Sequence, residues 1–167
     1  MSSQQSDSII TLRTPRTEDG ADVWRLVKAS GVLDVNSAYL YLLLCKDFAD
    51  TCTVAEKDGA LVGFVTGYRP PGRPDVLFVW QIGVDAAARG QGLGSRLLDT
   101  LLAQDGCRGI RFIETTISPS NKASRRLFHS LAERLDIEIV EGSGFEADIF
   151  PESGHEAENL FRLGPLR

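Results

Sequence analysis

The chain has 167 residues, of which 43% are hydrophobic and 25% charged, and its formal net charge is −5. This length suits one domain with a substantial core, and the composition is ordinary for a folded globular protein. Because the balance is acidic and no basic run offsets it, the sequence argues against a nucleic-acid partner.

The first eight residues are polar, and we expect them to form a mobile tail before a single domain over residues 9–167. They contain neither a signal-peptide core nor a basic start. No apolar run reaches the length of a transmembrane helix. These features predict a cytoplasmic protein that does not bind a membrane.

The N-terminal part predicts one strand followed by two helices. Residues 9–13 form the strand, which Pro15 stops. Thr17 is the predicted cap of the first helix, whose first turn is acidic. Residues 38–45 form the second helix, which is so apolar that we expect it to be buried on more than one side or pressed against a partner subunit.

A hairpin and a long central strand follow. Residues 51–57 and 60–68 are predicted strands joined by Asp58-Gly59, a strong signal for a two-residue hairpin turn. After a proline-rich loop at 70–74, residues 76–84 form an apolar run rich in β-branched and aromatic side chains. Such a run indicates a buried strand.

Three glycines come soon after this central strand, in Arg89-Gly-Gln-Gly-Leu-Gly94. Behind them, leucines recur with helical spacing over residues 95–104. Glycine lets the backbone approach a ligand closely, and the first N–H groups of a helix have no internal partners. Together with the helix dipole and the charge of Arg89, this strand–turn–helix unit predicts a site for a pyrophosphate.

The glycine spacing excludes two common nucleotide motifs. The glycines stand at 90, 92 and 94, which does not match the Gly-x-Gly-x-x-Gly dinucleotide pattern, and no Gly-Lys-Ser/Thr follows. A plain glycine turn joining a strand to a helix is the alternative to a phosphate site.

The C-terminal part continues the alternation of strands and helices. Strands alternate with helices through the middle of the chain, while the ends favour antiparallel pairing, so the sequence predicts a mixed α/β sheet. In chain order the predicted elements are a strand at 109–117, a helix from an Asn121 cap to Arg134, a strand at 137–140, an edge segment at 145–150 and a last strand at 158–163.

The cysteines at 45, 52 and 107 show neither metal-ligand nor redox-pair spacing. We therefore expect buried free thiols. No second histidine or cysteine lies at ligand spacing from His155, and the sequence predicts no metal site.

The stretch from Gln81 to Leu98 resembles the acetyl-CoA-binding motif of the GNAT N-acetyltransferase superfamily, Arg/Gln-x-x-Gly-x-Gly/Ala after a strand that ends in Val and before a Leu-rich helix. The resemblance in element order covers about Ile9 to Leu163. It implies an α/β fold with a mixed, mostly antiparallel central sheet of six to seven strands flanked by about four helices, and acetyl-CoA as co-substrate. The cofactor-binding residues that it implies are Gln81, Ile82, Gly83, Val84, Arg89, Gly90, Gln91, Gly92, Leu93, Gly94, Ser95 and Asn121.

One position departs from the family pattern. The stretch from Asn121 to Phe128 aligns with Asn-x-x-Ala-x-x-Leu-Tyr, whose tyrosine commonly protonates the departing CoA thiolate. Phe128 has no proton to give, so the usual general acid does not carry over. Tyr39, Tyr41, His129 or a water molecule are the alternatives.

Four further stretches resemble the diaminobutyrate acetyltransferase branch of this superfamily. That branch acetylates the γ-amino group of L-2,4-diaminobutyrate in ectoine biosynthesis, for osmoprotection, and is typically homodimeric. The resemblance therefore implies a small diamino acid as substrate and a homodimer. The stretches are Leu33–Cys45, Trp80–Val84, Glu114–Asn121 and Gly154–Leu160.

A diamino acid presents two ammonium groups and one carboxylate, so its pocket needs acidic and donor groups on different walls. Acidic side chains suit the ammonium groups, whereas donors orient the carboxylate or close the cavity. The alternative for each residue is structural: a helix cap, sheet core or a solvated charge. The substrate-binding candidates are Asp34, Asn36, Trp80, His155 and Glu158, and the catalytic candidates are Glu156, Glu114 and Tyr39.

We expect direct transfer with both substrates bound together and no acyl-enzyme. A carboxylate would take a proton from the amine, and backbone N–H groups of the central strand would polarise the thioester oxygen. Two alternatives stay open: an acetyltransferase for another small amine, and a CoA-binding module without catalysis, which Phe128 favours.

Overall fold

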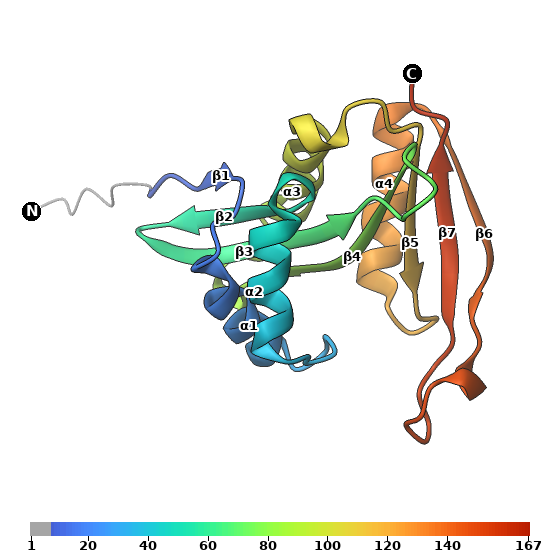
Figure 1. The fold of residues 1–167 in the computed structure, drawn as a ribbon, viewed down its shortest axis with the longest axis horizontal. Coiled ribbons are helices and arrows are strands. Elements are labelled where there is room, and N and C mark those ends of the chain that lie inside the picture. The colour runs from blue at the N-terminus through green and yellow to red at the C-terminus, as the bar shows by residue number, and fades with distance from the viewer. Residues whose placement is uncertain (1–7) are drawn as a thin grey trace, which may run out of the picture.

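A computed structural model describes residues 8–167 as one seven-stranded sheet with helices on both faces (Figure 1). The mobile tail predicted over residues 1–8 lies outside the described residues, except for Ser8. The described chain contains four α-helices, and one strand pair of the sheet is parallel. The predicted mixed, mostly antiparallel α/β fold is therefore confirmed.

The strands are β1 Thr11–Arg13, β2 Thr53–Lys57, β3 Ala60–Tyr68, β4 Val76–Val84, β5 Phe112–Ile117, β6 Glu138–Phe145 and β7 Glu158–Gly164. The α-helices are α1 Asp19–Ser30, α2 Ala38–Asp47, α3 Leu93–Leu102 and α4 Lys122–Leu135. Short 3-10 turns are η1 Ala49–Thr51, η2 Ala86–Ala88, η3 Asp105–Cys107 and η4 Ala147–Ile149.

The sheet opens along the line between β4 and β5. Its strand order is β1-β2-β3-β4-β5-β7-β6, and all neighbours are antiparallel except β4 and β5. These two parallel strands pair only as far as Val79 and Thr115. On the other side of β4, Trp80 has no partner on β3, which is a β-bulge. Beyond Val79 the strands diverge, as Figure 1 shows.

Two hydrophobic cores sandwich the sheet. One lies between the sheet and the pair α3 and α4, and it contains the leucines that the sequence places on one face of α3. The other lies under α1 and α2, around Tyr41 and Phe64. Tyr41 is fully buried, and Leu44 and Cys45 of the same helix α2 are buried as well, whereas Tyr39 on α2 is exposed.

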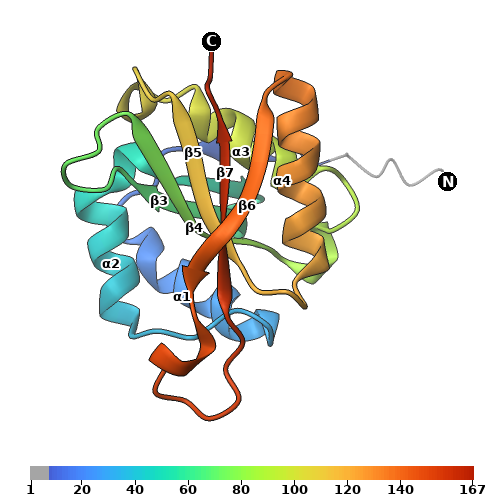
Figure 2. The same cartoon turned by 90° about the vertical axis from the view of Figure 1, so that its right-hand side faces the viewer.

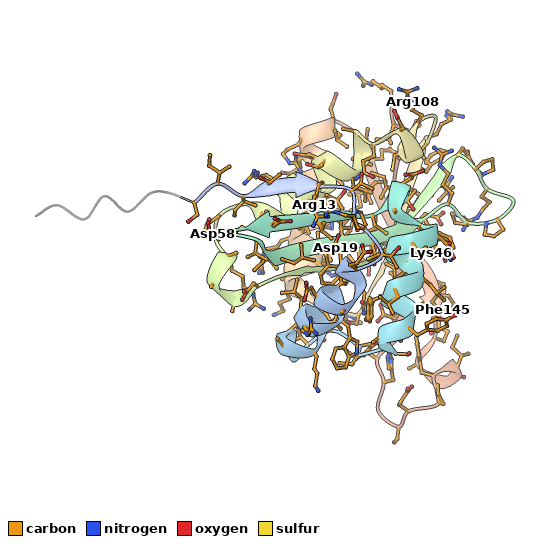
Figure 3. The ribbon with its side chains drawn as sticks, turned by 60° about the vertical axis from the view of Figure 1, so that its left-hand side comes forward. Arg13, Asp19, Lys46, Asp58, Arg108 and Phe145 are labelled. Atoms are coloured by element: carbon orange, nitrogen blue, oxygen red, sulfur yellow. The ribbon has the colours of Figure 1, made fainter. Side chains whose placement is uncertain are left out.

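A partly buried ion cluster fixes the start of α1. Arg13 of β1 donates to both carboxylate oxygens of Asp19 (2.7 and 3.0 Å) and also pairs with Glu56 of β2 (2.9 Å). Figure 3 shows Arg13 and Asp19 pointing toward one another. Asp19 also accepts the backbone N–H of Arg16 (2.7 Å). The predicted cap at Thr17 is wrong, because α1 begins at Asp19.

Most predicted elements lie where the sequence placed them. The strands at 60–68 and 76–84 are confirmed to the residue, and Asp58 and Gly59 both have positive φ at the hairpin turn. The predicted edge segment at 145–150 is wrong: β6 runs on to Phe145, and η4 follows. None of the described helices is long and apolar enough to cross a membrane.

Candidate active site

A cavity of about 1300 Å³ lies where β4 and β5 separate. Its walls come from the α1–α2 connection, α2, the β3–β4 connection, β5, β7 and the segment between β6 and β7. Figure 2 shows these segments around the uncovered face of β5 and β7. Its ionisable lining residues are Asp34, Tyr68, Arg73, Glu114, Lys122, His155, Glu156 and Glu158. Its larger apolar lining residues include Leu40, Leu44, Phe78, Trp80, Phe145 and Phe150.

The edge of β4 offers unpaired backbone groups to the gap. Asp85 N–H donates to Val62 on β3 (2.8 Å). Because backbone groups alternate sides along a strand, those of Ile82 and Val84 point away from β3, beyond the last pair with β5. Of the four backbone positions predicted to hold the cofactor, these two face the gap, whereas Gln81 and Gly83 face β3.

The glycine turn before α3 presents free N–H groups to solvent. The first backbone bond of α3 is from Arg96 N–H to the Gly92 carbonyl (3.2 Å), so the N–H groups of residues 93–95 have no helical partner. Gly90 and Gly92 have φ of 78° and 70°, the left-handed region, and a side chain at either would meet open space. These glycines therefore serve the backbone conformation and leave the helix N-terminus uncovered.

A buried hydrogen-bond network fastens the α1–α2 connection to β4. Tyr41 Oη donates to Gln81 Oε1 (2.9 Å), and Gln81 Nε2 donates to the Asp34 carbonyl (3.0 Å). Trp24 Nε1 donates to the Asn36 carbonyl (3.0 Å). The side chain of Gln81 therefore holds the connection that carries Asp34, a role that the sequence did not reveal.

His155 joins the β6–β7 segment to the same connection. Its Nδ1 donates to the Glu156 carbonyl (2.6 Å), its Nε2 lies 3.7 Å from Asp34 Oδ2, and its ring stacks on Phe150 at 3.8 Å. The hydrogen bond to the Glu156 carbonyl, reinforced by the charge of Asp34, raises the pKa of His155 above its ordinary value. His155 therefore links the β6–β7 segment to the α1–α2 connection at one end of the cavity.

Glu158 is a half-buried carboxylate in the middle of this wall. Desolvation raises the pKa of its carboxyl group, and the charges of Asp34 and Glu156 act in the same direction, whereas His155 and Thr116 oppose them. β6 bulges beside it, and a Cβ on Gly144 would lie 2.1 Å from the Glu158 carbonyl oxygen. A glycine at 144 is thus what lets β6 pack against β7 at this point.

Two other predicted carboxylates have different surroundings. Glu156 is exposed at the rim and accepts a hydrogen bond from Ser120. Glu114 is 3% exposed and ion-paired with Arg73 and Arg162. Since both oxygens of Glu114 already accept from guanidinium groups, the structure favours a positioning role for it over the predicted proton transfer.

The candidates for the missing general acid do not face the cavity. Phe128 is buried in the core under α4. Tyr39 is 67% exposed, Tyr41 is fully buried with its hydroxyl bound to Gln81, and His129 is exposed beside Phe161. None of the four lines the cavity. Tyr68 is the tyrosine that lines the cavity, and no feature of the sequence singled it out.

The cysteines play no part in this cavity. All three are buried free thiols, as predicted. Burial raises the pKa of Cys45 and Cys107 to about 11 and that of Cys52 to about 12. A thiol in this state is a poor nucleophile at neutral pH, which agrees with direct transfer without an acyl-cysteine.

The structure brings eight of the twenty predicted site residues into one cavity. Asn36, Tyr39, Ile82, Gly83 and Val84 do not line the cavity, and residues 89–95 lie outside its lining, around the start of α3. Asn121 caps α4, its Oδ1 accepting Ser124 N–H (3.1 Å). The predicted residues that line the cavity are Asp34, Trp80, Gln81, Glu114, Asn121, His155, Glu156 and Glu158.

Known proteins share both sequence and fold with this chain. The family model described as acetyltransferase (GNAT) family matches residues 21–132. L-2,4-diaminobutyric acid acetyltransferase of Marinococcus halophilus is 50% identical over 160 residues, covering 96% of this chain and 92% of that protein. The protein of the same name from Streptomyces avermitilis is 51% identical over 154 residues, covering 91% and 86%.

Solved structures extend the comparison to the fold. Diaminobutyrate acetyltransferase EctA from Paenibacillus lautus, in complex with L-2,4-diaminobutyric acid and coenzyme A, is similar with a TM-score of 0.92 and 46% identity, covering 95% of this chain and 96% of that chain. Ard1 from Thermoplasma volcanium has a TM-score of 0.73 at 20% identity, covering 93% and 97%, which is a likeness of fold alone.

Proposed function

This chain belongs to the acetyltransferase (GNAT) family, and we propose that it transfers the acetyl group of acetyl-CoA to the γ-amino group of L-2,4-diaminobutyrate, a step of ectoine biosynthesis. It is an acetyl-CoA-dependent N-acetyltransferase. The observation that supports this choice of substrate is the 46% identical structure solved with that diamino acid and coenzyme A, whose fold covers 95% of this chain. The reaction consumes acetyl-CoA, a co-substrate made inside the cell, which supports a cytoplasmic location.

Acetyl-CoA is proposed to lie across the opening between β4 and β5. Its pyrophosphate would bind the free N–H groups at the start of α3, where Arg89 adds a positive charge. Its pantetheine arm would run along the β4 edge, toward Ile82 and Val84. A backbone N–H of this edge would donate to the thioester oxygen as negative charge grows there.

The diamino acid is proposed to occupy the cavity with its γ-ammonium group near the acidic wall formed by Asp34, Glu156 and Glu158. An alkyl ammonium like that of lysine has a pKa near 10.4, so the γ-amino group must lose a proton before it attacks. We assign that proton to Glu158, since a half-buried carboxylate with a raised pKa is the better base of the three. The released nitrogen lone pair attacks the thioester carbon, and the C–S bond breaks.

The departing thiolate then needs a proton. Of the alternatives that the sequence left open, Tyr39, Tyr41 and His129 do not line the cavity. Solvent water is therefore the proposed donor. The products are the N-γ-acetylated diamino acid and coenzyme A.

A panel of amines tests the assignment. We expect the release of coenzyme A with L-2,4-diaminobutyrate to exceed that with lysine, ornithine or spermidine by at least about tenfold in kcat/KM, because these longer amines place the attacking nitrogen differently. Faster turnover of another amine would contradict the diaminobutyrate assignment. Tight binding of acetyl-CoA without turnover of any amine would favour the non-catalytic module.

We propose that the enzyme is a homodimer. Large apolar side chains are exposed next to the cavity, among them Val32, Val35 and Tyr39 of the α1–α2 region and Ile149 of η4. Covering such side chains is a common reason for association. Sedimentation equilibrium should give twice the mass of one chain, and a single-chain mass over the micromolar range would contradict the proposal.

A further inference from the structure

A paired cluster of guanidinium groups lies on the uncovered face of β5, at the end of the cavity away from Asp34. Arg73 Nη1 donates to both oxygens of Glu114 (3.0 and 2.9 Å), and Arg162 Nη1 donates to one of them (2.6 Å). Glu114 belongs to β5, Arg162 lies opposite it on β7, and Arg73 comes from the β3–β4 connection. Glu114 thus anchors the β3–β4 connection to the face of the sheet at β5.

Arg73 keeps donors that this ion pair does not use. A guanidinium group carries five N–H bonds, and in the described chain Glu114 engages Arg73 through Nη1 alone. The Arg73 side chain is 50% exposed and lines the cavity. Arg162 is held in place by the Phe112 ring, 3.8 Å from its guanidinium carbon. The cluster carries one net positive charge, because two guanidinium groups face one carboxylate.

The two ends of the cavity therefore differ in charge. Among the lining residues, Asp34, Glu156 and Glu158 lie with His155 at one end, whereas Arg73 lies with Glu114 at the other, and Arg162 pairs with Glu114 from outside the lining. Lys122 is the remaining cation in the lining, at the first residue of α4 beside Asn121. Figure 2 shows the connections that bear the two ends, β3–β4 and β6–β7, at opposite ends of the β5 and β7 face.

We propose that Arg73, positioned by Glu114, binds the α-carboxylate of the amino-acid substrate and thereby selects diamino acids over plain diamines. This inference rests on the proposed function and deepens it. A zwitterionic diamino acid lies with its carboxylate at the Arg73 end and its γ-ammonium group at the acidic end, so that both charges are matched. Arg73 contacts the substrate, whereas Glu114 acts through Arg73.

The dimensions of the cavity agree with this orientation. Glu114 and Thr116 lie on the same face of β5, about 7 Å apart along the strand. Thr116 contacts Glu158, the proposed base. Diaminobutyrate has four bonds of about 1.5 Å between its carboxylate carbon and its γ-nitrogen. With a hydrogen bond of about 3 Å at each end, its reach exceeds the separation of about 7 Å between Glu114 and Thr116 along β5.

The test compares two substrates that differ only in the carboxylate. L-2,4-diaminobutyrate and 1,3-diaminopropane share the attacking amine and the chain, but the second lacks the carboxyl group. We expect Arg73→Ala to lower kcat/KM for diaminobutyrate by about 10- to 100-fold, because a charge-assisted hydrogen bond is lost. We expect kcat/KM for diaminopropane to change less than about threefold. Arg108→Ala, which removes an exposed guanidinium paired with Asp105, is the matched control.

The supporting role of Glu114 has its own readout. Glu114→Gln should raise KM for diaminobutyrate while kcat and both constants for diaminopropane stay close to the parent values. Arg73→Lys, which keeps the charge without the planar fork, should recover part of the loss. Equal losses on both substrates in Arg73→Ala, or no loss on either, would overturn the inference. Failure of the parent enzyme to acetylate diaminobutyrate would instead overturn the proposed function, and the inference with it.

Discussion

Glu158→Gln is expected to lower kcat by about 10²- to 10⁴-fold at neutral pH, because the attacking amine loses its proton acceptor. Glutamine keeps the size and the hydrogen-bonding capacity of the side chain but cannot take a proton. KM for acetyl-CoA should stay near the parent value, since the proposed pyrophosphate site lies at α3. Steady-state kinetics with both substrates varied will measure the two effects separately.

The pH dependence gives a second measure of the same residue. Desolvation raises the pKa of Glu158, and a base must be deprotonated, so kcat/KM of the parent enzyme should fall as the pH drops through that raised pKa. This fall of kcat/KM at low pH, the acid limb of the pH profile, should disappear in Glu158→Gln. The folded-state pKa lies above the unfolded value, so the native state favours the protonated form, and ionisation of Glu158 lowers stability as the pH rises through this window.

The effect of Glu158 ionisation on stability provides a test of whether the Glu158→Gln variant still folds. Glu158→Gln removes a half-buried carboxyl group whose ionised form the fold disfavours, so the midpoint of thermal unfolding should be equal to or higher than that of the parent. Glu156→Gln is the matched variant, since Glu156 lines the same cavity and lies two residues away. If Glu156→Gln removes the acid limb and Glu158→Gln does not, the base is Glu156.

Gly92→Asp should weaken the binding of coenzyme A by about 10²- to 10³-fold. Asp at this N-cap position would offer its own oxygen to the free N–H groups of α3 and place a negative charge where the pyrophosphate is proposed to lie. Two unit charges about 4 Å apart near a protein surface repel by about 4 kcal/mol, which is the origin of this magnitude. Isothermal titration calorimetry with coenzyme A measures it directly.

Gly109→Asp controls for backbone strain. Gly109 also has positive φ (76°) with open space around it, but it lies in the turn before β5. Both variants should lose similar stability in urea denaturation, since each forces a side chain into the left-handed region. Only Gly92→Asp should bind coenzyme A more weakly than the parent protein. Parent-like affinity in a folded Gly92→Asp protein would place the pyrophosphate elsewhere.

The local parts of this structure follow from the sequence. The strand from Val76 to Val84, the glycine turn and the helix behind it form one continuous stretch, and their hydrogen bonds and glycine conformations depend on neighbours along the chain. The hairpin at Asp58 is predictable for the same reason. The edge segment predicted at 145–150 fails because an extended segment is defined by pairing, and β6 pairs with β7 only as far as Phe145.

The roles of the individual acidic residues could be assigned only from the tertiary structure. Glu114, Glu156 and Glu158 look alike in the sequence, but one is ion-paired with two guanidinium groups, one is exposed at the rim, and one is half-buried with a raised pKa. Arg73 stands in a proline-rich loop that resembles an ordinary connection. Its position over Glu114 depends on a contact between residues 41 positions apart.

The sequence by itself determined the order of most elements, the glycine turn before α3 and the family, because each of these depends on contiguous residues whose spacing sets their geometry. Only the tertiary structure decided which distant side chains meet. Strand β7 lies between β5 and β6, and this order brings Glu158 beside Thr116 and Arg162 beside Glu114. Such pairings arise from long-range packing and burial, which set the charge of each group, and no spacing along the chain encodes them.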